Sequence, residues 1–539
     1  MMETLLTVEN LQLSFAGQSV INGINFQINK GETFALVGES GSGKSLAALS
    51  VLRLHPAQAY LQADTIQLAD IDILRTPEFE LCQVRGRRVA MIFQDPMSSL
   101  NPVMTIGQQI AETIQLHFAL NKMQCTEKVL ALLAQVGIPD VQRRINEYPH
   151  QLSGGQRQRV MIAIALAGEP DLLIADEPTT ALDVTIQAQI LDLLKSIQQQ
   201  NGMALWLISH DLALVSNMAD RVAVMQSGNI VETADNKAIF SRPQHSYTQK
   251  LLQALPDITY QAKQQKPDTE TLLKLTDFKV HYPIRKGLLK RVVDHVKAVD
   301  GVSFTLATGK TLALVGESGC GKTTLGKGLL SLIPSTSGRV DFQGVDLASL
   351  SREQLRIQRA AMQIVFQDPF SAMNPRMYVL DIIAEGIRTL YPKTKVQEIV
   401  RQVTALLKQV GLDEAALYRF PHEFSGGQRQ RICIARALAV KPKLIVCDEP
   451  TSALDVSVQK QIIELLKSLQ KTQNISYLFI THDLAVVAEI ADDVAVMYAG
   501  KIVEQGSVDQ VLRHAQHPYT QKLLSAVPVL RRYTLGRKI

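Results

Sequence analysis

Two glycine-rich loops carry the most specific chemical pattern in this sequence. One spans Gly38 to Ser45 (GESGSGKS) and the other Gly316 to Thr323 (GESGCGKT), each between an apolar run that predicts a buried strand and a predicted helix. Glycines let the backbone wrap around phosphate groups with its N–H groups pointing inward, and the lysine adds a positive charge. We therefore predict a nucleoside triphosphate site at each loop.

Every residue of both loops is a candidate contact for the nucleotide. The lysines would reach the β- and γ-phosphates, and the hydroxyls of Ser45 and Thr323 would bind Mg²⁺. The candidates are Gly38, Glu39, Ser40, Gly41, Ser42, Gly43, Lys44 and Ser45 in the first loop, and Gly316, Glu317, Ser318, Gly319, Cys320, Gly321, Lys322 and Thr323 in the second.

Two carboxylates follow an apolar run in each half of the sequence. Residues 172–175 predict a buried strand that ends in Asp176 and Glu177, and Asp448 and Glu449 repeat this arrangement. We predict that the two aspartates hold Mg²⁺ and that the two glutamates activate the attacking water. The alternative is a pair of strand-end carboxylates engaged in salt bridges.

Two further polar residues follow predicted strands near the same site. Gln94 follows residues 89–93, and His210 follows residues 204–208. Their recurrence as Gln367 and His482 favours a function at the γ-phosphate over a structural role. We predict that all four are catalytic residues, and the two glutamines are also candidate metal ligands.

A glycine pair opens a predicted helix in each half, within the sequence SGGQ. Free N–H groups and the positive end of the helix dipole suit an anion, so this motif is a second candidate phosphate contact. The candidates are Ser153, Gly154, Gly155 and Gln156 in the first half, and Ser425, Gly426, Gly427 and Gln428 in the second.

The motifs recur at a nearly constant spacing. The loops lie 278 residues apart, Gln94 and Gln367 lie 273 apart, and the SGGQ serines, the glutamates and the histidines lie 272 apart. We therefore predict two tandem copies of one domain, residues 1–256 and 272–539, joined by a polar linker at 257–271.

Several local patterns predict the elements that position these motifs. Residues 5–26 alternate between apolar and polar, which predicts antiparallel strands with turns at Ala16-Gly17 and Asn22-Gly23. Residues 46–54 predict a helix, and residues 100–137 show the periodicity of amphipathic helices. The basic stretch 284–291 is interpreted as a solvated loop between strands, and contact with anionic lipid or a partner is the alternative.

The composition excludes several classes of protein. A hydrophobic fraction of 46% and a charged fraction of 20% describe an ordinary globular chain. A net charge of +5 is too small to predict a nucleic-acid partner. The five cysteines show no CxxC spacing, which argues against disulfides and zinc. We find no secretory signal and no 18-residue uncharged apolar segment, so we expect a cytosolic chain that does not span the membrane.

The complete set of motifs resembles that of the ATP-binding-cassette (ABC) ATPases, and the resemblance covers nearly the whole chain twice. The segments QDPMSSLNP at 94–102 and QDPFSAMNP at 367–375 further resemble the oligopeptide/dipeptide (Yej-type) importer branch. So do QHSYTQKLLQALP at 244–256 and QHPYTQKLLSAVP at 516–528. This resemblance implies an α/β fold with two tandem P-loop NTPase domains. Each would have a RecA-like core, an antiparallel β subdomain and a helical subdomain.

The same resemblance implies a function and a set of partners. Hydrolysis of ATP with Mg²⁺ would drive import of short peptides through two membrane-spanning permease subunits, supplied by a periplasmic or extracellular substrate-binding protein. The chain would lie peripherally at the cytoplasmic face of the inner membrane, with residues 100–137 docked on the permeases.

It also implies how the two domains cooperate. They would form an intramolecular head-to-tail pair in which SGGQ of one domain covers the nucleotide on the lysine of the other. ATP would close this pair and hydrolysis would reopen it. Asp183 and Asp455 would belong to the D-loops, and Phe15 and Tyr282 would stack on adenine.

Two other functions remain as alternatives. A twin-cassette ATPase acting on ribosomes usually has a long charged helical linker, whereas the linker here is short and mixed. An importer of a non-peptide small solute would share all of the nucleotide motifs. Many family members carry a cysteine cluster for iron–sulfur near the C-terminus, and no cysteine follows Cys447, so we expect no cluster.

Overall fold

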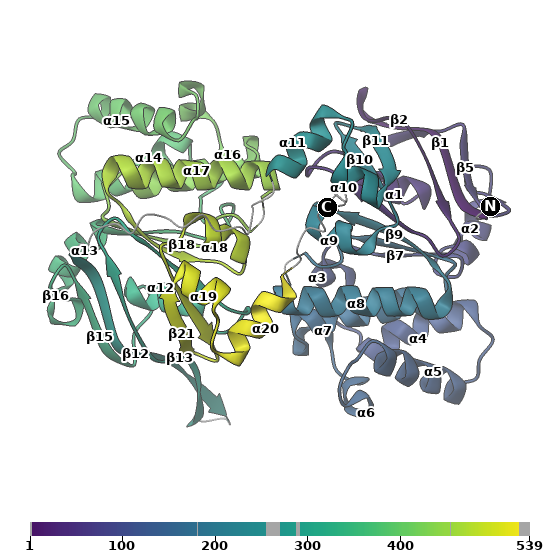
Figure 1. Ribbon diagram of the computed structural model, residues 1–539, viewed down its shortest axis with the longest axis horizontal. Coiled ribbons are helices and arrows are strands. Elements are labelled where there is room, and N and C mark those ends of the chain that lie inside the picture. The colour runs from purple at the N-terminus through teal and green to yellow at the C-terminus, as the bar shows by residue number, and fades with distance from the viewer. Residues whose placement is uncertain (1–2, 181, 255–269, 287–290, 453, 528–539) are drawn as a thin grey trace, which may run out of the picture. The chain divides into compact units, whose positions relative to one another are not determined.

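The computed structural model describes residues 3–180, 182–254, 270–286, 291–452 and 454–527. It divides into two compact units that contain nearly all of residues 3–253 and 254–527, and both combine sheets with helices (Figure 1). The α/β fold class is as predicted. Most of the predicted linker at 257–271 lies outside the described residues.

An antiparallel sheet, whose first strands are purple in Figure 1, opens the first unit. Its described strands are β1 Thr4–Phe15, β2 Gln18–Asn29, β4 Ala59–Gln62, β5 Thr65–Leu68 and β6 Ile71–Asp72. β1 is central and pairs with β2, β4 and β5. These pairings confirm the antiparallel strands, and the predicted turn at Ala16-Gly17 joins β1 to β2.

The second predicted turn, at Asn22-Gly23, is wrong. Both residues lie inside β2, where Ile24 pairs with Leu11 and Asn22 pairs with Gln12. Gly23 is therefore an extra residue in the strand, which is a β-bulge, and its φ of 74° is a value that glycine adopts without strain. An Asn-Gly pair suits a tight turn as well as a bulge, so the pair alone does not distinguish them.

A six-stranded sheet forms the centre of the first unit, as far as the described residues show. Its order is β11-β10-β3-β9-β8-β7, and all neighbours are parallel except β10 and β11. The strands are β3 Thr33–Val37, β7 Val89–Ile92, β8 Leu172–Asp176, β9 Ala204–Ser209, β10 Arg221–Gln226 and β11 Asn229–Asp235. Parallel strands end at one edge of a sheet, so the segments that follow β3, β7, β8 and β9 meet there.

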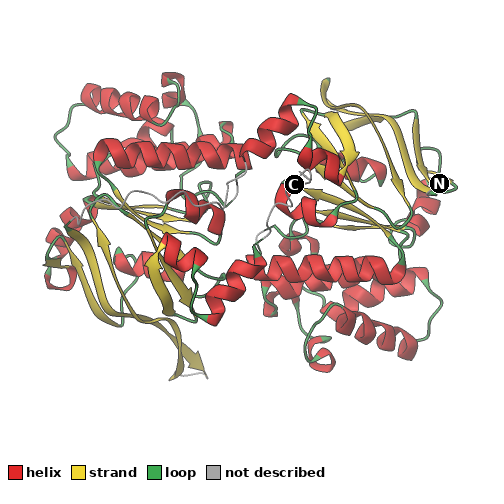
Figure 2. Cartoon of the chain, in the orientation of Figure 1, coloured by secondary structure: helices red, strands yellow, loops and turns green. Residues whose placement is uncertain are grey.

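Helices cover this sheet and extend from it (Figure 2). They are α1 Lys44–Val51, α2 Glu78–Val84, α3 Pro96–Ser99, α4 Ile106–His117, α5 Lys122–Gln135, α6 Val141–Arg144, α7 Gly154–Leu166, α8 Val184–Asn201, α9 Leu212–Met218, α10 Asn236–Ser241 and α11 Ser246–Ala254. The helices α4 and α5 confirm the predicted helical stretch and pack on each other and on α7. The helix predicted at 46–54 is α1, which begins two residues earlier and ends at Val51.

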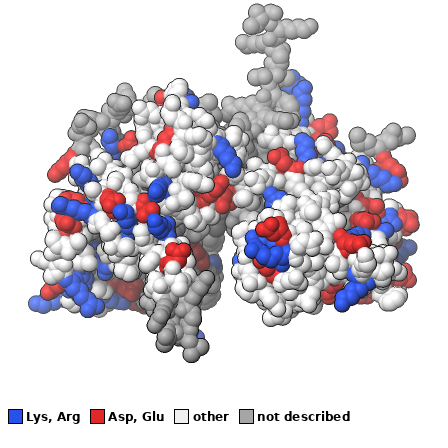
Figure 3. All heavy atoms as spheres, turned by 90° about the horizontal axis from the view of Figure 1, so that it is seen from below, with Lys and Arg blue, Asp and Glu red and all other residues white. Residues whose placement is uncertain are grey.

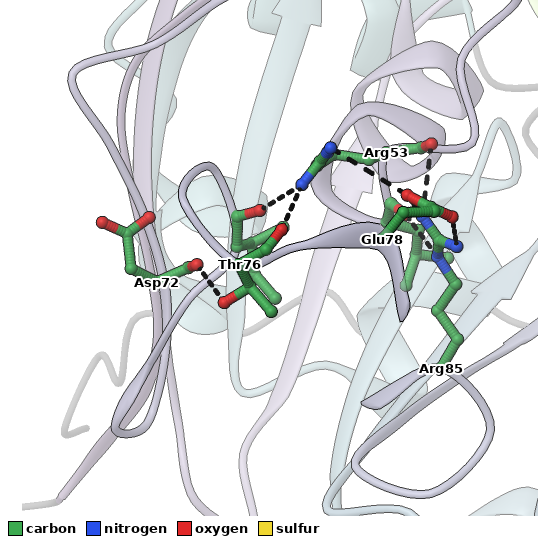
Figure 4. A network of polar contacts seen from close by, with 7 residues as sticks. Arg53, Asp72, Thr76, Glu78 and Arg85 are labelled. Carbon is green, nitrogen blue, oxygen red and sulfur yellow. Dashed lines mark hydrogen bonds and ion pairs between the residues drawn. The ribbon is translucent and has the colours of Figure 1, made fainter. Parts of the chain in front are cut away.

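A polar network holds the end of α1 (Figure 4). Arg53 follows this helix and donates to the main-chain oxygen of Thr76 at 2.7 Å. Arg85 donates to the main-chain oxygen of Leu52 at 2.9 Å and forms an ion pair with Glu78. Because the last carbonyl groups of a helix lack partners within the helix, the bond from Arg85 to Leu52 stabilises the C-terminal end of α1, and the bond of Arg53 ties this end to the segment before α2.

The second unit repeats this arrangement. An antiparallel sheet contains β12 Thr271–Lys286, β13 Arg291–Ala307, β15 Ser337–Phe342 and β16 Val345–Asp346, and its order over the described residues is β13-β12-β15-β16. The loop predicted at 284–291 is wrong at both ends, because β12 reaches Lys286 and β13 begins at Arg291. Residues 287–290 lie outside the described ranges.

The central sheet of the second unit has the order β17-β18-β19-β14-β20-β21 over its described strands. They are β14 Thr311–Val315, β17 Met362–Val365, β18 Leu444–Asp448, β19 Ser476–Ile480, β20 Asp493–Tyr498 and β21 Lys501–Ser507. The helices are α12 Lys322–Leu329, α13 Arg352–Ala360, α14 Val379–Leu390, α15 Val396–Gln409, α16 Gly426–Leu438, α17 Val456–Gln473, α18 Leu484–Ile490, α19 Val508–Arg513 and α20 Pro518–Ala526. This is the strand order of the first unit.

On the face shown in Figure 3, acidic and basic side chains lie close to one another. Within the described part of the chain, none of the helices has the length and apolar character needed to cross a membrane.

Candidate active sites

Each glycine-rich loop connects a central strand to a helix at the carboxyl edge of the sheet. Gly38, Gly41 and Gly43 have φ values of 158°, 77° and 104°. A Cβ atom on Gly38 would lie 2.2 Å from the main-chain oxygen of Met225 on β10, so only glycine fits there. The second loop repeats this backbone, with φ of 154°, 77° and 108° at Gly316, Gly319 and Gly321.

The lysine of each loop is buried inside the curve of its own backbone. Lys44 Nζ donates to the main-chain oxygens of Gly38 and Glu39, both at 2.8 Å. Lys322 donates to those of Gly316 and Glu317 at 2.7 and 2.9 Å. The middle of each loop is exposed, namely Ser40 and Gly41 in the first and Ser318 and Gly319 in the second. A positive charge inside an accessible glycine loop fits a phosphate group.

The predicted metal ligands lie together in each unit. Ser45 Oγ donates to Asp176 Oδ1 at 3.0 Å, and Thr323 Oγ1 donates to Asp448 Oδ1 at 2.9 Å. Burial raises the pKa of Asp176 to about 6, and it also raises the pKa of Asp448. A cation beside a buried carboxylate stabilises its ionised form, and Mg²⁺ prefers oxygen ligands. Both hydroxyl–carboxylate pairs therefore fit Mg²⁺.

The predicted catalytic glutamates have an uncommon backbone. Glu177 follows β8 with φ of 46°, and Glu449 follows β18 with the same φ. Their N–H groups donate to the main-chain oxygens of Ile208 and Ile480, at 2.9 Å in both units. Few non-glycine residues adopt positive φ, and the cost is of order 1–3 kcal/mol. The shared conformation gives each glutamate neighbours different from those of the aspartate before it.

In the first unit, the Glu177 carboxylate has three side-chain partners. His210 Nδ1 lies 3.1 Å from Oε1, and Oε2 accepts from Gln94 Nε2 at 3.0 Å and from Thr180 Oγ1 at 2.9 Å. Burial alone raises the pKa of Glu177, but the hydrogen bonds of His210 and Thr180 and the charges of His210 and Lys44 together outweigh it and lower this pKa to about 2. The hydrogen bond with Glu177 raises the pKa of His210.

The second unit has the same cluster with one difference. The Glu449 carboxylate lies 3.4 Å from His482 Nδ1 and accepts from Gln367 Nε2 at 2.9 Å. Ser452, at the position of Thr180, donates instead to the main-chain oxygen of Glu449 at 3.1 Å. Burial raises the pKa of Glu449, whereas the bond and charge of His482 lower it, and the net shift is downward.

These contacts refine the sequence prediction at two points. Each glutamine meets the glutamate of its own unit, and its role as a metal ligand stays a prediction. Thr180 and Ser452 were missed, although a hydroxyl three residues after each glutamate was a usable signal in both halves.

The SGGQ motifs lie at the start of α7 and α16. Ser153 and Gln156 form a capping box, in which the Gln156 N–H donates to Ser153 Oγ at 3.3 Å and the Ser153 N–H donates to Gln156 Oε1 at 3.1 Å. A Cβ atom on Gly155 would lie 2.7 Å from Ile186 Cγ2 on α8, so this glycine is needed for packing. Ser425, Gly426, Gly427 and Gln428 repeat this arrangement on α16. The contact of the SGGQ motifs with the nucleotide would be a second role besides this structural one, and it stays a prediction.

The remaining candidates lie on or beside other elements of the fold. Asp183 directly precedes α8, and Asp455 is the N-cap residue of α17. Phe15 ends β1 and packs partly on the core of the first antiparallel sheet, whereas Tyr282 on β12 is 43% exposed. Their predicted contacts with the nucleotide stay predictions.

Each unit thus places a phosphate-binding loop, a hydroxyl–carboxylate pair and a Gln–Glu–His cluster at the edge of one mostly parallel sheet. This defines a duplicated P-loop nucleoside triphosphatase. A family model described as "ABC transporter" matches residues 21–180 and 299–452. A second, described as "Oligopeptide/dipeptide transporter, C-terminal region", matches residues 231–278 and 503–538.

Curated relatives match over almost the whole chain. The sequence is 49% identical to the "Peptidoglycan transport ATP-binding protein YejF" of Agrobacterium fabrum, over 97% of this chain and 96% of that protein. It is 49% identical to the "Uncharacterized ABC transporter ATP-binding protein YejF" of Escherichia coli K12, over 97% and 100%. It is 47% identical to the "Glutathione import ATP-binding protein GsiA" of Escherichia coli O157:H7, over 97% and 90%.

The chain therefore belongs to the ABC transporter family, as an ATP-binding protein with two fused cassettes. It is an ATPase coupled to transmembrane transport, and the family uses ATP with Mg²⁺.

Proposed function

We propose that this chain is the ATP-hydrolysing subunit of an importer of short peptides. Its relatives include ATP-binding proteins named for peptidoglycan transport and for glutathione import, and its C-terminal regions match an oligopeptide/dipeptide transporter model. All of these solutes contain peptide or peptide-like amide bonds. This shared chemistry supports a short peptide as the cargo.

One observation supports hydrolysis in both cassettes. In each unit, a carboxylate lies within hydrogen-bond distance of a histidine and a glutamine, beside a buried hydroxyl–aspartate pair at the end of the neighbouring loop. No predicted catalytic position has been lost in either half. We infer two competent hydrolysis sites.

The chemistry follows from these positions. Ser45 with Asp176, and Thr323 with Asp448, would hold Mg²⁺, which would supply neutralisation of phosphate charge. Lys44 and the loop N–H groups hold the phosphates, and Lys322 does the same in the second unit. Glu177 and Glu449 orient the attacking water and accept its proton, while the histidine and glutamine fix each carboxylate.

The coupling is a property of the two cassettes together. In the proposed head-to-tail pair, Ser425, Gly426 and Gly427 contact the nucleotide on Lys44. Ser153, Gly154 and Gly155 contact the nucleotide on Lys322. A helix N-terminus contributes about 0.3–2 kcal/mol to binding an anion, so closure needs the full contact sets of both nucleotides. The domains in this proposal are residues 1–256 and 272–539, with the linker at 257–271.

The proposed partners are two membrane-spanning permease subunits and a periplasmic or extracellular substrate-binding protein. The chain lies at the cytoplasmic face of the membrane through contacts with the permeases. The helices α4 and α5, which follow Gln94, are the proposed docking region in the first unit.

Reconstitution tests the proposal directly. The purified chain, its permease subunits and its binding protein are placed in vesicles, and uptake of defined di- to decapeptides is measured with ATP. We expect uptake that needs ATP and stops in the Glu177→Gln/Glu449→Gln double variant. Co-purification with ribosomes in place of permeases would overturn the transport assignment.

Glutathione import is the second candidate function. The identity of 47% to a glutathione import ATP-binding protein favours it over other small solutes. Competition between labelled peptide and glutathione in the same vesicles separates the two.

A further inference from the structure

One tyrosine near the end of each unit contacts the phosphate loop of that unit. In the first unit, the Glu39 N–H donates to the Tyr247 hydroxyl oxygen at 3.3 Å. In the second, the Glu317 N–H donates to the Tyr519 hydroxyl oxygen at 3.0 Å. Tyr247 and Tyr519 lie on α11 and α20 (Figure 1), within the segments matched by the oligopeptide/dipeptide C-terminal model. We call them the loop tyrosines.

The same chain of hydrogen bonds positions both loop tyrosines. In the first unit, the Glu232 carboxylate on β11 accepts from the N–H groups of Gln244 and His245, at 2.8 and 3.0 Å. His245 Nδ1 then accepts from the Tyr247 N–H at 3.2 Å, so this nitrogen carries no proton. These bonds fix the start of α11 to the strand beside β10.

The second unit repeats each of these bonds. Glu504 on β21 accepts from the N–H groups of Gln516 and His517 at 2.7 and 3.1 Å. His517 Nδ1 accepts from the Tyr519 N–H at 3.2 Å. The contact is therefore a shared feature of both duplicated units.

On the loop side, the tyrosine and the phosphate-binding lysine hold the same residue. The Glu39 N–H donates to Tyr247, and the Glu39 carbonyl oxygen accepts from Lys44 Nζ at 2.8 Å. In the second unit, Glu317 is held in this way between Tyr519 and Lys322. The contact that Lys44 makes with its loop therefore depends on a peptide segment that Tyr247 fixes from the other end of the unit.

Such a loop needs external support. Its three positive-φ glycines have more conformational freedom than other residues and lose more entropy when they become ordered. A hydrogen bond that holds the loop in its binding conformation before the nucleotide arrives improves affinity by lowering this loss.

We propose that Tyr247 and Tyr519 are positioning residues that preorganise the phosphate loop for ATP. One role of the C-terminal region in each unit is then to support the nucleotide site of that unit. The inference rests on the assignment of both loops as ATP sites.

The test replaces only the hydroxyl group, in the full-length chain. Lys322→Ala removes the second site, so binding of a non-hydrolysable ATP analogue with Mg²⁺ reports the first site. In this background we expect Tyr247→Phe to weaken binding about three- to tenfold, the usual effect of one hydrogen bond. Tyr519→Phe should leave that binding unchanged. In the Lys44→Ala background, binding reports the second site. There, Tyr519→Phe should weaken binding and Tyr247→Phe should leave it unchanged.

Kinetics separate positioning from general stability. In the chain with both lysines intact, Tyr247→Phe and Tyr519→Phe should each raise KM for ATP while kcat changes less than about twofold. The melting temperature should stay within about 1–2 °C, roughly the effect of half a kcal/mol in a domain of this size. Tyr498→Phe is the matched control. Its ring lies 4.3 Å from that of Tyr519, it is 47% exposed, and its hydroxyl has no hydrogen bond to any residue in the described ranges. We expect no change in affinity from it.

Three results would overturn the inference. They are unchanged affinity in both Tyr→Phe variants, equal losses at both sites from either tyrosine, and a loss of the same size from Tyr498→Phe. If Tyr247→Phe does not fold, Glu232→Gln tests the same chain of bonds, and a site-selective loss of affinity is again expected. If the parent chain binds no ATP, the assignment of the loops as ATP sites is wrong. That result is distinguishable from a failure of the proposed role of the tyrosines.

Discussion

The two glutamate sites share their backbone and differ in their hydroxyl groups. Both glutamates have φ of 46°, and both meet a histidine and a glutamine. Thr180 adds a third bond to the carboxylate of Glu177, whereas Ser452 bonds a main-chain oxygen, and the histidine distance grows from 3.1 to 3.4 Å. The fold therefore sets where the carboxylate lies, and one nearby side chain sets how firmly it is held.

The phosphate loops show a second difference of the same kind. Ser42 in the first loop corresponds to Cys320 in the second, and the lysine lies 3.5 Å from the serine oxygen and 3.8 Å from the sulfur. The lysines keep the same main-chain contacts in spite of this change. Function that depends on main-chain geometry should be equal in the two units, and function that depends on these side chains should differ.

The largest effect is expected from removing the general bases. Glu177→Gln and Glu449→Gln keep the size of the side chain but remove the proton acceptor. General-base catalysis contributes roughly 10²–10⁴-fold, so the double variant should lose at least about 10²-fold in single-turnover ATP hydrolysis. Each single variant should lose its own site.

The control for this prediction is Glu169→Gln. This exposed glutamate pairs with Lys128 away from both sites, and its substitution should leave hydrolysis unchanged. Full ATPase and transport activity in Glu177→Gln alone would contradict the assignment of the first site.

The next effect concerns which site each SGGQ motif serves. Ser153→Arg places a long cation at the start of α7. In the head-to-tail proposal it should weaken binding of the nucleotide at Lys322 by about 10- to 30-fold. This factor corresponds to the upper range of the free energy that a helix N-terminus contributes to binding an anion. Ser425→Arg should do the same to the nucleotide on Lys44. Site-resolved crosslinking of a labelled ATP analogue to each half, in the chain that keeps both lysines, checks this, and losses in the motif's own unit would contradict the proposal.

A smaller effect is expected on stability from the packing glycines. An alanine Cβ at Gly427 would lie 2.3 Å from Val458 Cγ1, against 2.7 Å from Ile186 Cγ2 at Gly155. Overpacking costs about 1–3 kcal/mol, so both variants should melt several degrees lower, with the larger shift for Gly427→Ala. Gly154→Ala is the control for stability, because its nearest neighbour would be 3.7 Å away. Unchanged melting of Gly427→Ala in calorimetry would show that α16 and α17 separate easily.

Much of the fold follows from the sequence for simple reasons. Thr33–Val37 is a short apolar run directly before a glycine loop, and it forms the predicted buried strand, β3. The Asn22-Gly23 pair was assigned to a turn because its chemistry suits both a turn and a bulge. Only the pairing of β1 with β2 decides between them.

The residues of the site can be predicted from the sequence where one short motif contains them. They are less predictable where they come from distant segments that meet only in the fold. The lysines, hydroxyls and acids have motif spacing and lie together as expected. The positive φ of Glu177 could not be predicted from the sequence, because a glutamate, unlike a glycine, does not indicate this backbone conformation. Tyr247 lies 208 residues from Glu39, and their contact depends on how α11 packs beside the central sheet.

The smallest effect sharpens the difference between the two phosphate loops. Cys320 is buried and burial raises its thiol pKa, whereas Cys82 is exposed. Because the thiolate is the reactive form, alkylation should label Cys82 first and Cys320 slowly. ATPase activity should fall only during the slow labelling of Cys320, and by about half if the two sites contribute equally. The loss should be confined to the second site, and bound ATP should prevent it. Cys320→Ser, which restores the residue of the first loop, should be resistant, and Cys82→Ser should behave as the parent. A loss of activity that follows the labelling of Cys82 would contradict this difference between the loops.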